Sequence, residues 1–177
     1  MKPTVIMGID PGFHVTGYAV LKHDELEKSY LLDYGYLQMS PKKKLPERVG
    51  EFYKFIDEKI KMHAVRQVSL ETSFLGKNAQ TFLKLGYLRG LLYLLADQHG
   101  LELYEFAPRE IKMSVVGHGG ATKEQVATMV LRLFPKLNEL KKIAKNDVTD
   151  ALAICVCGFW MRRQQQGIHE KSKAMHR

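Results

Sequence analysis

Two short apolar runs in this chain each end in an acidic residue. The first run covers Val5–Asp10 and is followed by a Pro-Gly pair, and the second covers Gln67–Glu71. Runs of this length, bounded by turn signals, are typical of buried strands. Functional side chains of an open sheet gather where strands end, so Asp10 and Glu71 would lie close together if their strands are neighbours.

A second acidic pair lies near the other end of the chain. Asp147 and Asp150 are three residues apart, in a helix predicted from Asp147 to about Arg163 with Asn146 as its N-cap, so they share a helix face. Four carboxylates in one small site repel each other unless a cation is present, and Mg²⁺ prefers carboxylate ligands. Two such ions can position an attacking water and stabilise a leaving oxygen, which indicates phosphodiester hydrolysis. The predicted metal ligands are Asp10, Glu71, Asp147 and Asp150.

Each of these acids also has a simpler interpretation. Asp10 precedes a Pro-Gly pair and could only form a turn. Glu71 could be a solvated residue at a strand end. Asp147 and Asp150, in the first turn of the predicted helix, could only complement the helix dipole. The metal-site prediction therefore depends on the joint placement of all four, and so on the order of the strands.

The predicted elements run from strands to helices, which indicates an α/β domain with a mixed five-stranded sheet flanked by helices. The first three strands should form an antiparallel meander. Residues 1–163 are predicted to form this domain and residues 164–177 a basic, flexible tail. The predicted strands are 5–10, 16–21, 29–39, 67–71 and 102–106. The first predicted helix has apolar residues at helical spacing from Val49 to Ile60, with Pro46 near its start. The other predicted helices are 78–99, 109–116, 122–133, where Thr122 and Gln125 can form a capping box, and 147–163.

The chain is basic, with 27 Lys and Arg residues against 19 Asp and Glu residues and a formal net charge of +8. This balance favours a polyanionic substrate, although a basic soluble protein with no such partner would have the same charge. No apolar stretch is long enough to span a membrane, and no signal-peptide pattern opens the chain, so we expect a cytoplasmic protein with no membrane contact. Cys155 and Cys157 are interpreted as buried, reduced thiols.

Several short motifs match one known family in order and spacing, from about residue 5 to 158. They are Ile9-Asp10-Pro11-Gly12, Val15-Thr16-Gly17-Tyr18, Glu71, Phe74, Lys77-Asn78-Ala79, Leu83-Lys84-Leu85-Gly86, Arg89-Gly90, Ala107–Lys112, Ser114–Gly117 and Asp147–Ala153. In these motifs the chain resembles the RuvC Holliday junction resolvases. The segment 22–45 and the C-terminal tail match poorly.

The resemblance implies an RNase H-like fold whose four acids form the metal site, with Mg²⁺ as the cofactor and Mn²⁺ as a substitute. It implies a homodimeric endonuclease of DNA recombination and repair, which nicks two opposing strands of a four-way junction symmetrically. The products would carry 5′-phosphate and 3′-hydroxyl ends. It further implies preferred cutting at a short thymine-containing sequence and partnership with the RuvA–RuvB branch-migration complex.

Three further residues take roles from the same resemblance. Lys112 and Lys123 stand at positions of lysines near the scissile phosphate, where a cation can stabilise developing charge. Phe74 stands where the family uses an aromatic side chain to stack on junction bases. Without the family, the lysines would be read as solvated helix residues, and Phe74 could equally pack into the core. Further candidate phosphate contacts are Lys42–Lys44, Lys77, Lys84 and Arg89.

Gly86 and Gly90 lie four residues apart on one face of the predicted helix 78–99. Each glycine costs helix stability, about 1 kcal/mol relative to alanine. Close approach of another backbone would explain them, and that backbone could belong to the protein's own sheet or to a second copy across a two-fold axis.

Other functions fit the sequence less well. A phosphotransferase or ATPase of the actin, Hsp70 and sugar-kinase type also opens with a strand followed by Asp-x-Gly, but this chain has no second copy of that segment and no phosphate loop. A non-catalytic junction binder would not need all four acids. Another RNase H-like nuclease is disfavoured by Phe74, Lys112 and Lys123. His14 and His118 are interpreted as exposed loop histidines; the alternative for His118 is an approach to a phosphate.

Overall fold

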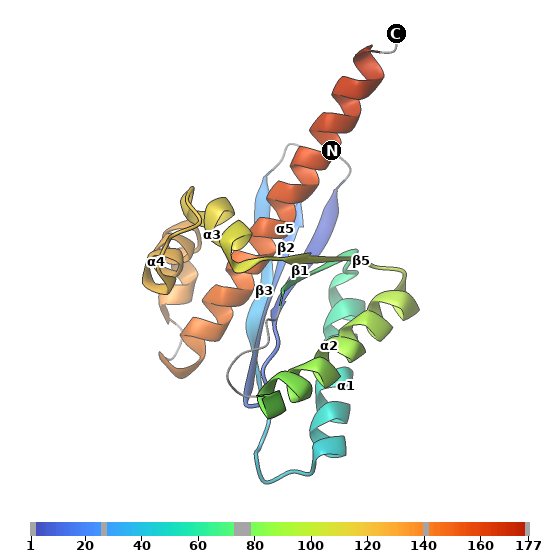
Figure 1. Ribbon diagram of the computed structural model, residues 1–177, viewed down its shortest axis with the longest axis vertical. Helices are drawn as coiled ribbons and strands as arrows, with labels where there is room; N and C mark the ends of the chain where they lie inside the picture. Colours follow the sequence, from blue (N-terminus) through green and yellow to red (C-terminus); the bar gives the residue numbers. More distant parts are fainter. Residues whose placement is uncertain (1–2, 26–27, 73–78, 140–141, 176–177) are drawn as a thin grey trace.

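A five-stranded sheet forms the centre of the computed structural model, which describes residues 3–25, 28–72, 79–139 and 142–175 (Figure 1). The strand order is β3-β2-β1-β4-β5. The first three strands pair antiparallel, and β4 and β5 continue the sheet parallel to β1, so the predicted mixed sheet and its meander are confirmed. The strands are β1 (Thr4–Asp10), β2 (Val15–His23), β3 (Ser29–Gln38), β4 (Gln67–Glu71) and β5 (Glu102–Phe106).

Helices cover both faces of the sheet. Helices α1 and α2 pack on one face, and α3, α4 and α5 lie on the other (Figure 1). The helices are α1 (Leu45–His63), α2 (Ala79–His99), α3 (Pro108–Val116), α4 (Lys123–Leu133) and α5 (Lys142–Met175), with a 3₁₀ turn at Pro135–Glu139. No helix in the described part of the chain combines the length and the apolar character that a membrane span requires.

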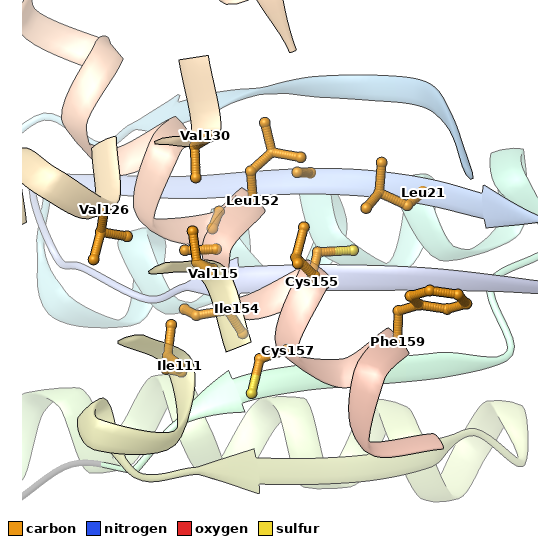
Figure 2. Packing of buried hydrophobic residues seen from close by; sticks show 14 of the residues in the cluster. Leu21, Ile111, Val115, Val126, Val130, Leu152, Ile154, Cys155, Cys157 and Phe159 are labelled. Atoms are coloured by element: carbon orange, nitrogen blue, oxygen red, sulfur yellow. The ribbon is translucent and has the colours of Figure 1, made fainter. Parts of the chain in front are cut away.

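Alternate residues of each strand supply two separate hydrophobic cores, because side chains on a strand point to opposite faces in turn. Ile6 of β1 packs on the α5 side, while Met7 and Ile9 pack on the α1 side. Figure 2 shows the α5 side, where Leu152, Ile154, Cys155, Cys157 and Phe159 of α5 meet Leu21 of β2 and apolar residues of α3 and α4. Both cysteines are buried and free, as predicted.

Two glycines let α5 approach the sheet so closely that main-chain atoms of the helix and the strands are in contact. A Cβ placed on Gly8 of β1 would lie 2.2 Å from the Ala151 carbonyl oxygen, and a Cβ on Gly17 of β2 would lie 2.1 Å from the Asp147 carbonyl oxygen. Both contacts are far inside van der Waals separation, so no side chain fits at either position. The helix therefore crosses β1 and β2 close to the end of β1, where Asp10 lies.

The limits of the last helix differ from the prediction. The helix begins at Lys142 rather than Asp147, because residues 142–145 (Lys-Ile-Ala-Lys) are themselves good helix formers. Asn146 is thus inside the helix and is not its N-cap. The helix also continues past Arg163 to Met175. The separate, flexible tail at 164–177 remains a prediction.

Candidate active site

Asp10 and Glu71 end two strands that are direct neighbours. Strands β1 and β4 pair in parallel, with Ile9 opposite Leu70, so the residue that follows each of these lies at the same edge of the sheet. This confirms the strand arrangement on which the sequence prediction depended. Thr16 fixes the loop after Asp10, since its hydroxyl donates to the Gly12 carbonyl at 2.9 Å and accepts from the Gly12 amide at 3.2 Å.

Helix α5 brings the second acidic pair to the same place. Gly17 is the register partner of Asp10, and the main chain of Asp147 lies directly over Gly17. Asp150 is one turn further along α5 and interacts electrostatically with both Asp10 and Glu71. Since α5 starts at Lys142, Asp147 and Asp150 lie beyond its first turn, where the helix dipole has little effect. The simple dipole interpretation of this pair is therefore weakened.

The negative charge of the cluster is only partly compensated. The pKa of Asp10 is raised to about 7, first by burial and then by the negative charges of Asp150, Glu71 and Asp147. The pKa of Glu71 is raised by burial and by Asp150. The pKa values of Asp147 and Asp150 are also raised, in both cases chiefly by burial. Such shifts in mutually close acids mark a site where a cation would be stabilised.

Two lysines border the cluster. Lys123 is the first residue of α4, after a capping box in which the Thr122 amide donates to the Gln125 side chain at 2.8 Å, as the sequence predicts. Its ammonium group lies 3.6 Å from Oδ2 of Asp150, and its side chain is 84% exposed. Lys112 of α3, Lys123, Glu71 and Asp150 together line a pocket of about 150 Å³. The positive charge is thus near the acids and open to a ligand.

The donor set fits a hard divalent cation, although the side chains do not form a closed chelate. Among the described residues, no three carboxylate, imidazole or thiol groups are grouped so that they could hold one ion. The four candidate ligands are nonetheless all carboxylates, which are the donors that Mg²⁺ prefers, and they carry excess negative charge. The metal site therefore stays a prediction that the chemistry of the donors supports.

Arg89 has a different position from the one expected of a phosphate contact. Its guanidinium donates through Nη1 to the main-chain carbonyl of Glu71 at 2.7 Å and through Nη2 to the carboxylate of Glu105. Its side chain is only 11% exposed. No local pattern in the sequence indicates these contacts, since they join residues 18 and 16 positions apart.

The remaining predicted DNA contacts and the two loop histidines are either exposed or lie outside the residues that the structure describes. Phe74 and Lys77 lie outside the described residues, so their predicted roles are not tested. Lys84 of α2 is exposed, and so are Lys42–Lys44 before α1, where Lys43 pairs with Glu51 at 2.9 Å. The side chains of His14 and His118 are also exposed.

Comparison with known proteins gives consistent matches. The family model described as "Crossover junction endodeoxyribonuclease RuvC" matches residues 6–158. A crossover junction endodeoxyribonuclease RuvC from Chlorobium phaeovibrioides is 43% identical over 154 residues, which cover 86% of this chain and 79% of the relative. The structure of Thermus thermophilus RuvC aligns with a TM-score of 0.77 at 29% identity, over 91% of this chain and 97% of the other.

A second structure shows T. thermophilus RuvC in complex with a Holliday junction substrate. It aligns with a TM-score of 0.77 at 25% identity, over 90% of this chain and 96% of the other. These matches confirm the predicted RNase H-like fold class. The family match spans most of the chain, including all four acids, Lys112 and Lys123. The chain belongs to the RuvC family of crossover junction endodeoxyribonucleases.

Proposed function

We propose that this protein is a structure-selective endonuclease that resolves Holliday junctions in homologous recombination and DNA repair. It nicks two opposing strands of a four-way junction symmetrically and leaves 5′-phosphate and 3′-hydroxyl ends. The observation that carries the proposal is the meeting of Asp10 and Glu71, at the ends of adjacent parallel strands, with Asp147 and Asp150 of α5 in a chain of the RuvC family. The basic net charge of +8 suits a DNA substrate.

The family implies a divalent metal, and we assign its ligands to Asp10, Glu71, Asp147 and Asp150. Mg²⁺ is the proposed cofactor, with two ions per site, and Mn²⁺ the proposed substitute. Bound there, the ions would supply positive charge to an attacking water and to the leaving oxygen. Burial and mutual repulsion disfavour the ionised forms of these acids. A bound cation would offset this repulsion, so the cluster favours cation binding.

The side chains around the acids have separate proposed roles. Lys123 and Lys112 bind the scissile phosphate and stabilise its developing negative charge, since both line the pocket beside Glu71 and Asp150. Phe74 stacks on a junction base, and Lys77 contacts DNA. Lys84 and Lys42–Lys44 contribute phosphate contacts away from the site.

A homodimer is proposed through the outer face of α2. Gly86 and Gly90 are exposed there, and a Cβ added to either would meet nothing within 4 Å, so packing against the protein's own sheet does not explain them. Large apolar side chains surround the glycines on the same face, since positions 83, 87 and 94 share it. These exposed residues are Leu83, Tyr87 and Leu94. A second copy that covers this face would place two sites in one assembly, as symmetric nicking requires.

Membership of the RuvC family also supports a proposal about the setting of the reaction. We propose that the protein works in the cytoplasm with the RuvA–RuvB branch-migration complex. Residues 164–177, which are rich in basic side chains, are proposed to add loose DNA contacts beyond the domain at 1–163.

Cleavage of synthetic junctions tests the proposal. With Mg²⁺, the purified protein should convert a four-way junction into two nicked duplexes whose nicks can be sealed by a ligase. Asp10→Asn and Glu71→Gln should lower the cutting rate at least about 10³-fold, because several kcal/mol of charge stabilisation is lost, while junction binding remains. Normal cutting by these variants would refute the site. Equal rates on junctions and on linear duplex would refute structure selectivity.

A further inference from the structure

We propose that Arg89 is a positioning residue that holds Glu71 in place through its main chain, and that it does not bind DNA phosphate. The inference rests on the proposed function for the role of Glu71, but its geometry is independent of that role. Nη1 of Arg89 donates to the Glu71 carbonyl oxygen at 2.7 Å. The arginine therefore contacts the backbone of a predicted metal ligand and not its carboxylate, which stays free to bind.

The guanidinium is itself held from the other side. Nη2 of Arg89 donates to Oε1 of Glu105, and the hydroxyl of Tyr93 donates to the same oxygen at 2.7 Å. Arg89 and Tyr93 both belong to α2, and Glu105 belongs to β5. The arginine thus joins three elements: the helix α2, the end of β4 and the strand β5.

The end of β4 needs such support. Glu71 is the last residue of β4, which lies between β1 and β5. The pairing of β4 with β1 ends at Leu70, so on that side Glu71 has no paired neighbour in the sheet. Beyond Glu71, the Thr72 amide donates to the Phe106 carbonyl oxygen at 2.9 Å. Arg89 adds a charged donor at the point where strand pairing stops, and hydrogen bonds to charged groups are stronger than neutral ones.

The same geometry argues against a phosphate contact. The side chain of Arg89 is 11% exposed, and its charge is paired with Glu105. Lys84, on the same helix, is exposed and has the form expected of a phosphate contact. The two residues therefore provide a matched pair: one basic side chain that faces the protein and one that faces solvent.

One consequence is a link between α2 and the site. Arg89 lies between Gly86 and Gly90 in sequence, in the helix whose outer face is the proposed dimer contact. A shift of α2 on assembly would reach the backbone of Glu71 through the Arg89 side chain, in addition to the shared apolar core.

Two measurements on Arg89→Met, Glu105→Gln and Lys84→Met test the proposal. The first is hydrogen exchange at the Thr72 amide in the free protein, without metal or DNA. Arg89→Met should speed this exchange about 10-fold, since loss of the charged bond frees the strand end, and Glu105→Gln should change it in the same direction. Lys84→Met should leave it unchanged. Unchanged exchange in Arg89→Met would overturn the proposal.

The second measurement is Mn²⁺ binding followed by electron paramagnetic resonance, together with junction affinity in the absence of metal. Arg89→Met should weaken Mn²⁺ binding about 10-fold, as loss of a supporting contact does at metal sites, and leave the junction affinity within about twofold. Arg89→Lys should restore part of the Mn²⁺ affinity. The opposite pattern, a loss of junction affinity and of its salt dependence with normal Mn²⁺ binding, would make Arg89 a phosphate contact.

These measurements separate two kinds of failure. If the wild-type protein neither binds Mn²⁺ nor cuts junctions, the proposed function is wrong, while the exchange at Thr72 still decides whether Arg89 holds the strand end. Glu105→Gln keeps the arginine and its charge, so it reports on positioning even if Arg89→Met folds poorly.

Discussion

Helices α5 and α2 lie on opposite faces of the sheet and use their apolar residues differently. Between Val148 and Phe159, the side chains of α5 are buried almost without interruption, against the sheet, α3 and α4. Helix α2 buries Leu88, Leu92, Leu95 and Ala96, but leaves Leu83 58% exposed and Leu94 44% exposed. The apolar surface of this part of α5 is thus buried within one chain, whereas that of α2 is not. A helix that is apolar all round is expected to be buried, which points to a partner for α2.

Glycines show the same contrast. Gly8 and Gly17 are in contact with the backbone of α5, while Gly86 and Gly90 have open space around them. The first pair places the acids of α5 beside Asp10. No contact among the described residues explains the second pair. One face of the sheet therefore carries the candidate active site, and the other carries the proposed dimer contact.

The largest expected effect is at the contact between β2 and α5. Gly17→Ala places a Cβ 2.1 Å from the Asp147 carbonyl oxygen, so α5 must shift, and we expect a loss of about 3 kcal/mol in the free energy of unfolding. Gly50→Ala is the matched control, because its Cβ meets nothing within 4 Å. Denaturant unfolding of both variants measures the difference. Equal stability would mean that the close approach of α5 is not needed.

The next effect concerns the exposed face of α2. Leu83→Glu should weaken dimerisation about 100-fold, because a charge would be buried without a partner at the proposed interface. Met62→Glu is the control, since Met62 is 59% exposed but belongs to α1. Sedimentation equilibrium gives both dissociation constants. If Leu83→Glu remains as dimeric as the control, another surface forms the dimer.

A smaller effect is expected from the negative charge of Asp10, which lies on the α5 side of the sheet. The pKa of Asp10 is raised from its ordinary value of 3.8 to about 7 in the folded protein. Folding therefore takes up a proton between these pH values, and stability falls as the pH rises from about 4 to 7. Asp10→Asn removes this penalty. In a chelator at pH 8 it should be more stable than wild type by about 2 kcal/mol, and the gain should disappear near pH 4. Thermal unfolding across this range measures it, and a gain that grows toward low pH would contradict the pKa shift.

The smallest effect is expected at Gly86, where a substitution should change the stability of α2 and the affinity of the dimer in opposite directions. Gly86→Ala should stabilise the isolated monomer by about 1 kcal/mol, because alanine is the better helix former and its Cβ meets nothing. It should also weaken the dimer, because the added methyl group holds the second helix away. Unfolding at low protein concentration measures the stability of the monomer. Sedimentation at high concentration measures the dissociation constant of the dimer. A dimer of unchanged affinity would show that Gly86 is not at a close contact.

The sequence predicted those features that depend on local patterns. The apolar runs identified β4 with its correct limits, Gln67–Glu71, and the Thr122–Gln125 pair identified the start of α4. Both ends of α5 were missed, since neither a proline nor a strong capping residue marks them. Its start matters for function, because it moves Asp147 and Asp150 out of the first turn.

Features that depend on distant contacts could not be predicted in the same way. Nothing in the local sequence shows that Gly8 and Gly17 must lack a side chain. They must do so because of contact with α5, a helix more than 120 residues further along the chain. The charge of Arg89 makes it a candidate phosphate contact in the sequence, whereas its hydrogen bonds to the Glu71 carbonyl and to Glu105 could not be predicted from it. Asp10 and Glu71 were the exception, since the ends of two parallel neighbouring strands meet by geometry alone.

Mixed dimers of wild-type protein and Glu71→Gln, purified with two different affinity tags, test whether each chain contains one nuclease centre and whether α2 pairs two of them. The substrate is a supercoiled plasmid that extrudes a four-way junction. Wild-type dimers should cut both strands within one binding event and give linear plasmid. The mixed dimer should cut one strand and give only nicked circles. Linear plasmid from the mixed dimer at the wild-type rate would show that the two cuts do not come from two paired centres.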